Sequence, residues 1–318
     1  MVFRRDYTLT SLDYLFRYTA LTTPYLEMYY SIARWITLQL VSVGIIIILI
    51  VVILGEIVTG SAPTHVETLL PDFSVEAVQI PVKNNDYAVH GWLARGKNGG
   101  GAILLVHSIR SNRLEMLSRA RFLNDLGYHV LMIDLQAHGE TPGNRITFGA
   151  RESADVTAAV TFLRNTFPQE RIAAIGATLG AAAIVLADPA PQLDAIILES
   201  LHPTFAEAVA NRLRLHLGKY GENLQFLLLP YFSFLLGLPV DDLNPIDKIK
   251  NITAPILFIN GTLDKHTTRS EVKKLYDAAH FPKKLWIVQG AGHYNMHTYA
   301  GENYEKHVAD FLSDYLRK

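Results

Sequence analysis

The stretch Arg171-Ile-Ala-Ala-Ile-Gly-Ala-Thr-Leu-Gly180 decides the fold of this chain. It reads as an apolar strand, then a turn with the pattern Gly-x-Thr-x-Gly, then a helix of small residues over 179–186. Glycines on both sides of the central residue allow a turn so tight that larger side chains would clash there. Strand, turn and helix in this order are typical of a nucleophile elbow, whose central residue attacks the substrate. Such elbows carry serine, whereas this one carries Thr178.

Two later strands also end in chemically active residues. Asp264 follows the predicted strand 256–260, and His293 follows the predicted strand 284–288. The carboxyl ends of parallel strands meet at one edge of a sheet, where such proteins hold their sites. The chain order hydroxyl, carboxylate, imidazole therefore predicts a triad of Thr178, Asp264 and His293.

The rest of the chain from residue 75 onward alternates between strands and helices. The expected strands are continuous apolar runs, which indicates a mostly parallel sheet with helices on both faces and an α/β fold class. Before them, residues 75–82 and 87–94 read as a hairpin. The other predicted strands are 102–106, 129–133 and 195–198, and the predicted helices are 113–126, 150–167, 269–279 and 303–316.

Four loops give the chain a resemblance to a known family. They are His107-Ser-Ile109, Asp134-Leu-Gln-Ala-His-Gly-Glu-Thr141, Ile259-Asn-Gly-Thr-Leu-Asp-Lys-His266 and Gly290-Ala-Gly-His293. With the elbow, they make residues 75–316 resemble a membrane-anchored α/β-hydrolase of the serine aminopeptidase S33/monoacylglycerol-lipase-like group. The chain departs from the family pattern at Thr178, Ser108, Gln136 and Ala137.

The resemblance implies a site and an activity. Thr178 is then the nucleophile position, Asp264 the acid and His293 the base. The backbone N–H groups of Ile109 and Leu179 form the oxyanion hole. The implied reaction is hydrolysis of a carboxylic ester or amide, and we expect no cofactor and no metal. An apolar segment over 224–240 in the insertion, together with the predicted membrane anchor, further suggests a small-molecule substrate with an apolar acyl group.

Thr178 leaves two functions open. Its hydroxyl can give a proton to His293, as nucleophilic catalysis requires. However, a β-branched residue is unfavourable in the strained backbone of an elbow, and its methyl group crowds the attacking face. The first interpretation is therefore a hydrolase, and the second is a catalytically impaired binding or scaffold module on the same fold.

Some nearby residues offer alternative roles. Ser108 and Ser111 are rival nucleophiles, although neither stands on an elbow. Glu199 ends a neighbouring strand and could replace Asp264 as the acid. His293 and His297 have the i, i+4 spacing of zinc ligands on a helix, but no Glu stands between them.

An uncharged apolar segment runs from Trp35 to Gly55, between Arg34 and Glu56. About 20 helical residues cross the hydrocarbon core of a bilayer, so this segment predicts a transmembrane helix. The alternatives are a buried core helix and a cleaved signal peptide. The predicted organisation is a segment over 1–34, a transmembrane helix over 35–58, a linker over 59–74 and the hydrolase domain over 75–318.

Basic residues near the apolar segment predict its orientation. Arg4, Arg5, Arg17 and Arg34 precede it, and the next Lys or Arg after it is Lys83. The positive-inside rule then places the N-terminus in the cytoplasm and the hydrolase domain outside. Residues 7–33 read as two short amphipathic helices separated at Pro24, or else as a plain cytoplasmic tail.

An insertion over 200–250 separates two predicted strands and is long for a simple connection. It contains a predicted helix over 205–217, with Arg212 and Arg214, and an apolar stretch over 224–240. We interpret it as a lid over the active site. The alternatives are an apolar core segment and a second membrane span.

Composition excludes several classes of function. With 29 Lys and Arg against 30 Asp and Glu, the net charge is −1, so we expect no nucleic-acid partner. The chain has no cysteine, which excludes disulfides, thiolate zinc sites and a cysteine nucleophile. The expected partners are a lipid bilayer and a small acyl ester or amide.

Overall fold

The computed structural model describes residues 11–66 and 71–317, with side chains from residue 25 onward. The chain divides into two compact units, Met1–Leu54 and Gly55–Lys318. The first ten residues of the predicted N-terminal segment and residues 67–70 of the predicted linker lie outside the described residues.

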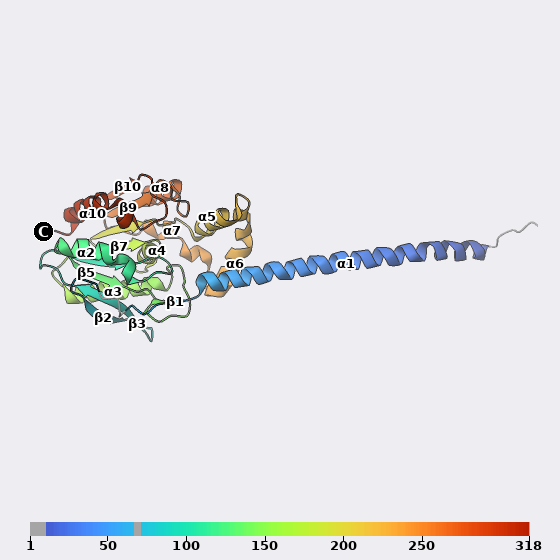
Figure 1. The fold of residues 1–318 in the computed structure, drawn as a ribbon, viewed down its shortest axis with the longest axis horizontal. Helices are drawn as coiled ribbons and strands as arrows, with labels where there is room; N and C mark the ends of the chain where they lie inside the picture. Colours follow the sequence, from blue (N-terminus) through green and yellow to red (C-terminus); the bar gives the residue numbers. More distant parts are fainter. Residues whose placement is uncertain (1–10, 67–70, 318) are drawn as a thin grey trace, which may run out of the picture. The chain divides into compact units, whose positions relative to one another are not determined.

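Helix α1, Ser11–Thr59, accounts for the described part of the first unit and ends in the second (Figure 1). It continues through Pro24, so the expectation of two short helices separated at that residue is wrong. A proline inside a helix removes one hydrogen bond and costs about 3 kcal/mol or more. No glycine precedes Gly44, so no second residue of low helix propensity adds to the effect of Pro24 nearby. The helix therefore continues on both sides of the proline.

The apolar part of α1 is exposed. In the described part of the chain, Tyr25–Thr59 is the one helical segment long and apolar enough to cross a membrane. Leu40 and Ile48 are 68% and 63% exposed. A core helix would bury such side chains, so the alternative of a buried core helix is wrong.

An eight-stranded sheet forms the centre of the second unit, in the order β10-β9-β8-β7-β4-β5-β3-β2. Neighbouring strands are parallel, except that β3 is antiparallel to both β5 and β2. The predicted mostly parallel sheet and its leading hairpin are confirmed. The strands are β2 Glu76–Pro81, β3 Ala88–Ala94, β4 Ala102–Val106, β5 His129–Ile133, β7 Ile172–Ala177, β8 Ala195–Glu199, β9 Ile256–Gly261 and β10 Lys283–Val288.

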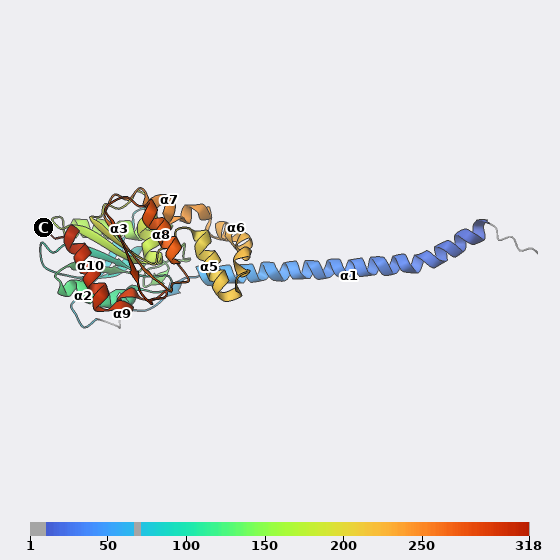
Figure 2. The same cartoon turned by 90° about the horizontal axis from the view of Figure 1, so that it is seen from above.

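Helices cover both faces of this sheet (Figures 1 and 2). Successive residues of a strand point to opposite faces, so Leu104 and Leu105 of β4 belong to two separate apolar cores. The first core is closed by α3 Glu152–Thr166, α4 Leu179–Leu186 and α8 Arg269–Ala278. The second is closed by α2 Leu117–Asp125, α9 Met296–Ala300 and α10 Glu302–Tyr315.

The start of the predicted linker is attached to the second unit by hydrogen bonds. β1, Ala62–Pro63, pairs in parallel with β6, His138–Gly139. Val66 is buried, and its N–H donates to Glu140. The sequence indicated only a linker here, because its partners lie more than 70 positions further along the chain.

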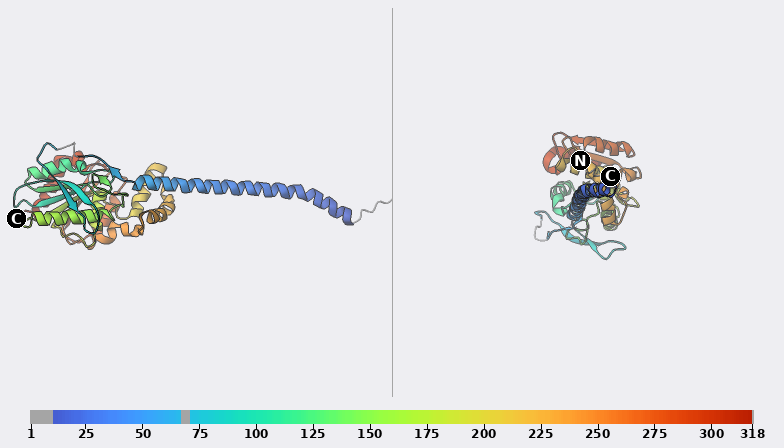
Figure 3. Two further views of the ribbon diagram at one scale, coloured as in Figure 1. Left: turned by 90° about the horizontal axis from the view of Figure 1, so that it is seen from below. Right: turned by 90° about the vertical axis from the view of Figure 1, so that its right-hand side faces the viewer.

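The insertion between β8 and β9 forms three short helices, α5 Phe205–Leu217, α6 Gln225–Leu236 and α7 Pro245–Ile249. Helices α5 and α6 lie side by side, at the end of this unit opposite the C-terminus (Figures 2 and 3). The 12 residues of α6 span about 18 Å, too short for the ~30 Å hydrocarbon core. The alternative of a second membrane span is therefore wrong.

Candidate active site

The sharp turn at Thr178 connects β7 to α4. Its backbone has φ 47° and ψ −94°, a region that non-glycine residues rarely adopt. A Cβ on Gly176 would lie 2.5 Å from the nitrogen of Ala181, and one on Gly180 would lie 2.3 Å from the carbonyl oxygen of Val106. Any larger residue at position 176 would clash with α4, and any larger residue at position 180 would clash with β4. Both glycines are therefore required, as the pattern predicted.

The three residues of the predicted triad lie in hydrogen-bond contact. The hydroxyl oxygen of Thr178 is 3.3 Å from Nε2 of His293, and Nδ1 of His293 is 2.9 Å from Oδ2 of Asp264. When Nδ1 carries the proton and donates to Asp264, Nε2 is free to accept the proton of the Thr178 hydroxyl. The geometry thus permits proton transfer from hydroxyl to imidazole.

The Asp264 carboxylate accepts four hydrogen bonds. Its Oδ1 accepts from the backbone N–H groups of His266 and Thr267, at 2.8 and 2.9 Å. Its Oδ2 accepts from His293 and from the Ser200 hydroxyl, the latter at 3.0 Å. Burial alone would raise the pKa of Asp264, but these hydrogen bonds outweigh it and lower the pKa below its usual value. The carboxylate is therefore ionised at neutral pH.

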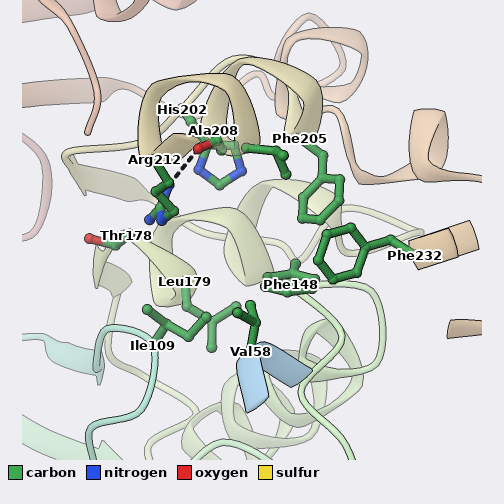
Figure 4. A pocket seen from close by; sticks show the side chains of 11 residues that line it. Val58, Ile109, Phe148, Thr178, Leu179, His202, Phe205, Ala208, Arg212 and Phe232 are labelled. Carbon is green, nitrogen blue, oxygen red and sulfur yellow. Dashed lines mark hydrogen bonds between the residues drawn. The ribbon is translucent and has the colours of Figure 1, made fainter. Parts of the chain in front are cut away.

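Two backbone N–H groups beside Thr178 have no acceptor among the described residues: those of Ile109 and Leu179. Leu179 is the first residue of α4, where helical N–H groups lack an intrahelical partner. Ile109 stands between two fixed neighbours, since the Ser108 N–H donates to Glu115 and the Arg110 N–H donates to His138. Ile109 and Leu179 line the same cavity as Thr178 (Figure 4).

Two buried histidines hold this loop, and the sequence did not indicate that role. Nε2 of His107 accepts from the backbone N–H of Leu135, and Nε2 of His138 accepts from Arg110, both at 3.0 Å. Burial lowers the pKa of both imidazoles, for His138 to about 4, so each is neutral and keeps one accepting nitrogen. Their positions directly after β4 and in the loop after β5 were the only signal.

Two cavities of different character flank Thr178. The first, of about 70 Å³, has largely apolar walls, including the mutually packed rings of Phe148, Phe205 and Phe232 (Figure 4). The second, of about 100 Å³, is polar and is lined by residues such as Glu115 and Asn295. A substrate whose carbonyl carbon reaches the Thr178 hydroxyl would thus have the apolar cavity on one side and the polar cavity on the other.

The alternative site residues have other partners. The Ser108 hydroxyl donates to Glu115 at 2.7 Å, and no hydrogen bond joins it to His293 in the described part of the chain. Glu199 pairs with the buried Arg119 and accepts from the Tyr304 hydroxyl. It is therefore part of a structural ion pair.

The two nitrogens of His297 are also occupied. Nδ1 lies 2.9 Å from the Ser118 hydroxyl, and Nε2 lies 2.9 Å from a carboxylate oxygen of Glu305. Among the side chains that the structure describes, in residues 25–66 and 71–317, no three His, Asp or Glu are grouped so that they could hold a metal ion. The zinc alternative is thus not supported by the geometry.

Sequence comparison places this site within a known family. Residues 103–305 match the family described as "Alpha/beta hydrolase family". Protein YqkD of Bacillus subtilis is 28% identical over 236 residues, which cover 72% of this chain and 76% of YqkD. Protein MT2364 of Mycobacterium tuberculosis is 30% identical over 208 residues, which cover 64% of this chain and 67% of that protein.

Solved structures show the same fold. The esterase Pf2001 of Pyrococcus furiosus superposes with a TM-score of 0.64 at 24% identity, over 81% of this chain and 98% of the esterase. The esterase EaEST of Exiguobacterium antarcticum gives 0.56 at 12% identity, over 75% of this chain and 100% of that one. At these identities the likeness concerns the arrangement of the backbone.

Proposed function

Because this chain belongs to the alpha/beta hydrolase family, we propose that it hydrolyses a carboxylic ester or amide bond through Thr178, His293 and Asp264. The observation that carries the proposal is the continuous hydrogen-bonded series from the Thr178 hydroxyl through His293 to Asp264, on a strained turn beside two free N–H groups. Two of the solved structures with a similar fold are esterases, and this similarity supports an ester as the substrate in preference to an amide.

The reaction proceeds in two halves. In the first, Nε2 of His293 takes the proton of Thr178 as its oxygen attacks the carbonyl carbon, and the N–H groups of Ile109 and Leu179 stabilise the developing oxyanion. His293 then protonates the leaving alcohol or amine, which leaves an acyl group on Thr178. In the second half, His293 activates a water that releases the acid and restores the hydroxyl.

The two cavities divide the substrate between them. The apolar cavity receives the acyl group, and the polar one receives the leaving group. A water needs about 10–15 Å³ of such space, so the apolar cavity of about 70 Å³ has room for an acyl chain of only a few carbons. Helix α6, which contributes Phe232, would have to move for a longer chain, and we propose that α5 and α6 serve as the lid.

A second candidate function is a binding module without catalysis. The observation that favours it is the backbone of Thr178, where a residue with a branched Cβ costs about 1–3 kcal/mol. A methyl group on the carbon that carries the hydroxyl also crowds the attack on a substrate. The hydrogen bonds to His293 and Asp264 favour the hydrolase, because a binding module needs neither.

Thr178→Ser separates these two functions. The substitution removes the methyl group and keeps the hydroxyl, so hydrolysis of 4-nitrophenyl butyrate by the full chain should rise about tenfold, which corresponds to ~1.4 kcal/mol of barrier. Release of 4-nitrophenol measures it. If both the natural protein and a folded Thr178→Ser variant are inert, the binding module becomes the better account.

Two phenylalanines of α6 test the lid. Phe232 is 4% exposed and lines the apolar cavity, whereas Phe234 on the same helix is 83% exposed. Phe232→Leu should enlarge the cavity and raise the ratio of kcat/KM for the octanoyl over the butyryl ester by about fivefold, on the scale of a few methylene contacts. Phe234→Leu is the matched control. Equal shifts in both variants would contradict the lid.

We propose further that α1 anchors the protein in a membrane with the hydrolase domain outside. The proposal is supported by the exposed apolar residues of α1 and by the basic residues that precede them. A cleaved signal sequence remains the competing account of the same helix. Protease added to intact cells should degrade the domain, and protection until lysis would contradict the orientation. Loss of residues 1–55 from the mature protein would favour the signal sequence.

A further inference from the structure

Arg212 is the charged residue among the largely apolar walls of the first cavity. It extends from α5 toward Thr178 (Figure 4). Its Nη1 donates to the carbonyl oxygen of Ala208 in the same helix, at 3.0 Å. No salt bridge involves this guanidinium within the described residues. By contrast, Arg214, two residues along α5, pairs with Glu222 and also donates to Asn211.

None of the described carboxylates forms a salt bridge with Arg212. Burial lowers the pKa of Arg212, and the charge of Asp264 opposes this shift only in part. The oxygens of Asp264 already accept four hydrogen bonds from other groups. His202 and His266 are the nearby imidazoles. The pKa of His202 is lowered to about 3. Burial is the largest cause, and the neighbouring Arg212 and His293 add to it. The pKa of His266 is lowered to about 4, again mainly by burial, with His293 and Arg212 adding to it. His202 and His266 are therefore both neutral at pH 7.

His202 is itself without a partner. It is 7% exposed, and neither of its ring nitrogens has a hydrogen bond among the described residues. Leaving a buried polar group unpaired is unfavourable, because it loses its hydrogen bonds to water without gaining others. Two polar side chains in the same largely apolar wall, the unpaired His202 and the Arg212 guanidinium, therefore offer donors to a polar group of a ligand.

The chemistry of a guanidinium defines that ligand. Its N–H groups form a rigid planar fork that matches two oxygens of a carboxylate or phosphate. Only one of the five N–H groups of Arg212 has an acceptor within the described residues. A neutral His202 offers one more donor through whichever ring nitrogen carries the proton.

We propose that Arg212, with His202, binds a carboxylate or phosphate group that the substrate carries on its short acyl chain. The natural substrate is then an anionic ester with a short acyl chain, and not a neutral lipid ester. This inference rests on the proposed function, because the anion is part of a substrate only if the protein is a hydrolase. Binding of the anion itself does not require turnover.

Calorimetric titration of the full chain in detergent tests the binding. The probes are butyrate, propylphosphonate and butan-1-ol, which have similar size. At least one of the two anions should bind tenfold or more tightly than the alcohol, and the better anion identifies the group as carboxylate or phosphate. Arg212→Gln should abolish this preference, and Arg212→Lys should recover part of it, because the charge returns without the fork. Arg214→Gln is the matched control and should keep the preference in full.

Three results would overturn the inference: equal binding of the alcohol and both anions, an unchanged preference in both Arg212 variants, or equal losses in Arg212→Gln and Arg214→Gln. Hydrolysis of 4-nitrophenyl butyrate, assayed in parallel, separates this inference from the proposed function. An inert protein with an Arg212-dependent anion preference supports the anion site and contradicts the hydrolase. An active protein without that preference contradicts the anion site alone.

Discussion

His293→Ala should lower hydrolysis of 4-nitrophenyl butyrate by about 1,000-fold or more. Without the imidazole, no group accepts the proton of Thr178, whose hydroxyl is a poor nucleophile while protonated. The 3.3 Å contact between the Thr178 hydroxyl and Nε2 of His293 is the basis of this expectation. Steady-state kinetics with the natural protein and with Thr178→Ser measure the loss in both backgrounds.

The matched control is His307→Ala. The His307 ring lies exposed on α10 and stacks on Trp286, so its loss removes an imidazole without touching the site. This variant should keep full activity. If His293→Ala hydrolyses the ester as fast as His307→Ala does, His293 is not the base, and the reaction must be assigned to another group.

Asp264→Asn should cost about 1,000-fold or more, although it changes only one atom. Oδ1 of Asp264 accepts from two backbone N–H groups, so the amide oxygen of an asparagine takes that side and its NH₂ faces His293. Nδ1 must then accept, which puts the proton on Nε2. In that tautomer the imidazole cannot accept a proton from Thr178.

The pH dependence separates this account from a general loss of charge. The pKa of Asp264 lies below its usual value, so the carboxylate is ionised at neutral pH and above. Lost activity of Asp264→Asn should therefore not return at higher pH within the stable range. Asp277→Asn is the control, because Asp277 is exposed and pairs only with Lys273 among the described residues. Equal activity of the two variants would contradict a role for Asp264.

Much of the fold could be predicted because its strands are short continuous apolar runs. β4 and β5 have the predicted bounds, since each run ends at a change in polarity. The predicted triad could be assembled from the rule that parallel strands bring their carboxyl ends together. The small-residue helix after Thr178 likewise has its predicted bounds, Leu179–Leu186.

The missed features depend on contacts between residues far apart in sequence. Ser200 and Asp264 are 64 positions apart, and no local pattern pairs them. The linker strand β1 is only two residues long and exists because it meets β6. The continuity of α1 through Pro24 was missed for a different reason, because a proline lowers helix propensity without forbidding a helix.

Covalent labelling tests the central claim, that Thr178 is the nucleophile, most directly. A fluorophosphonate reacts with a hydroxyl that an imidazole has activated, and the adduct can be located by mass spectrometry of the digested full chain. We predict one adduct, on Thr178, that is absent from His293→Ala and present in His307→Ala. No adduct in a folded protein, or an adduct on Ser108 or Ser111 in place of Thr178, would contradict the account.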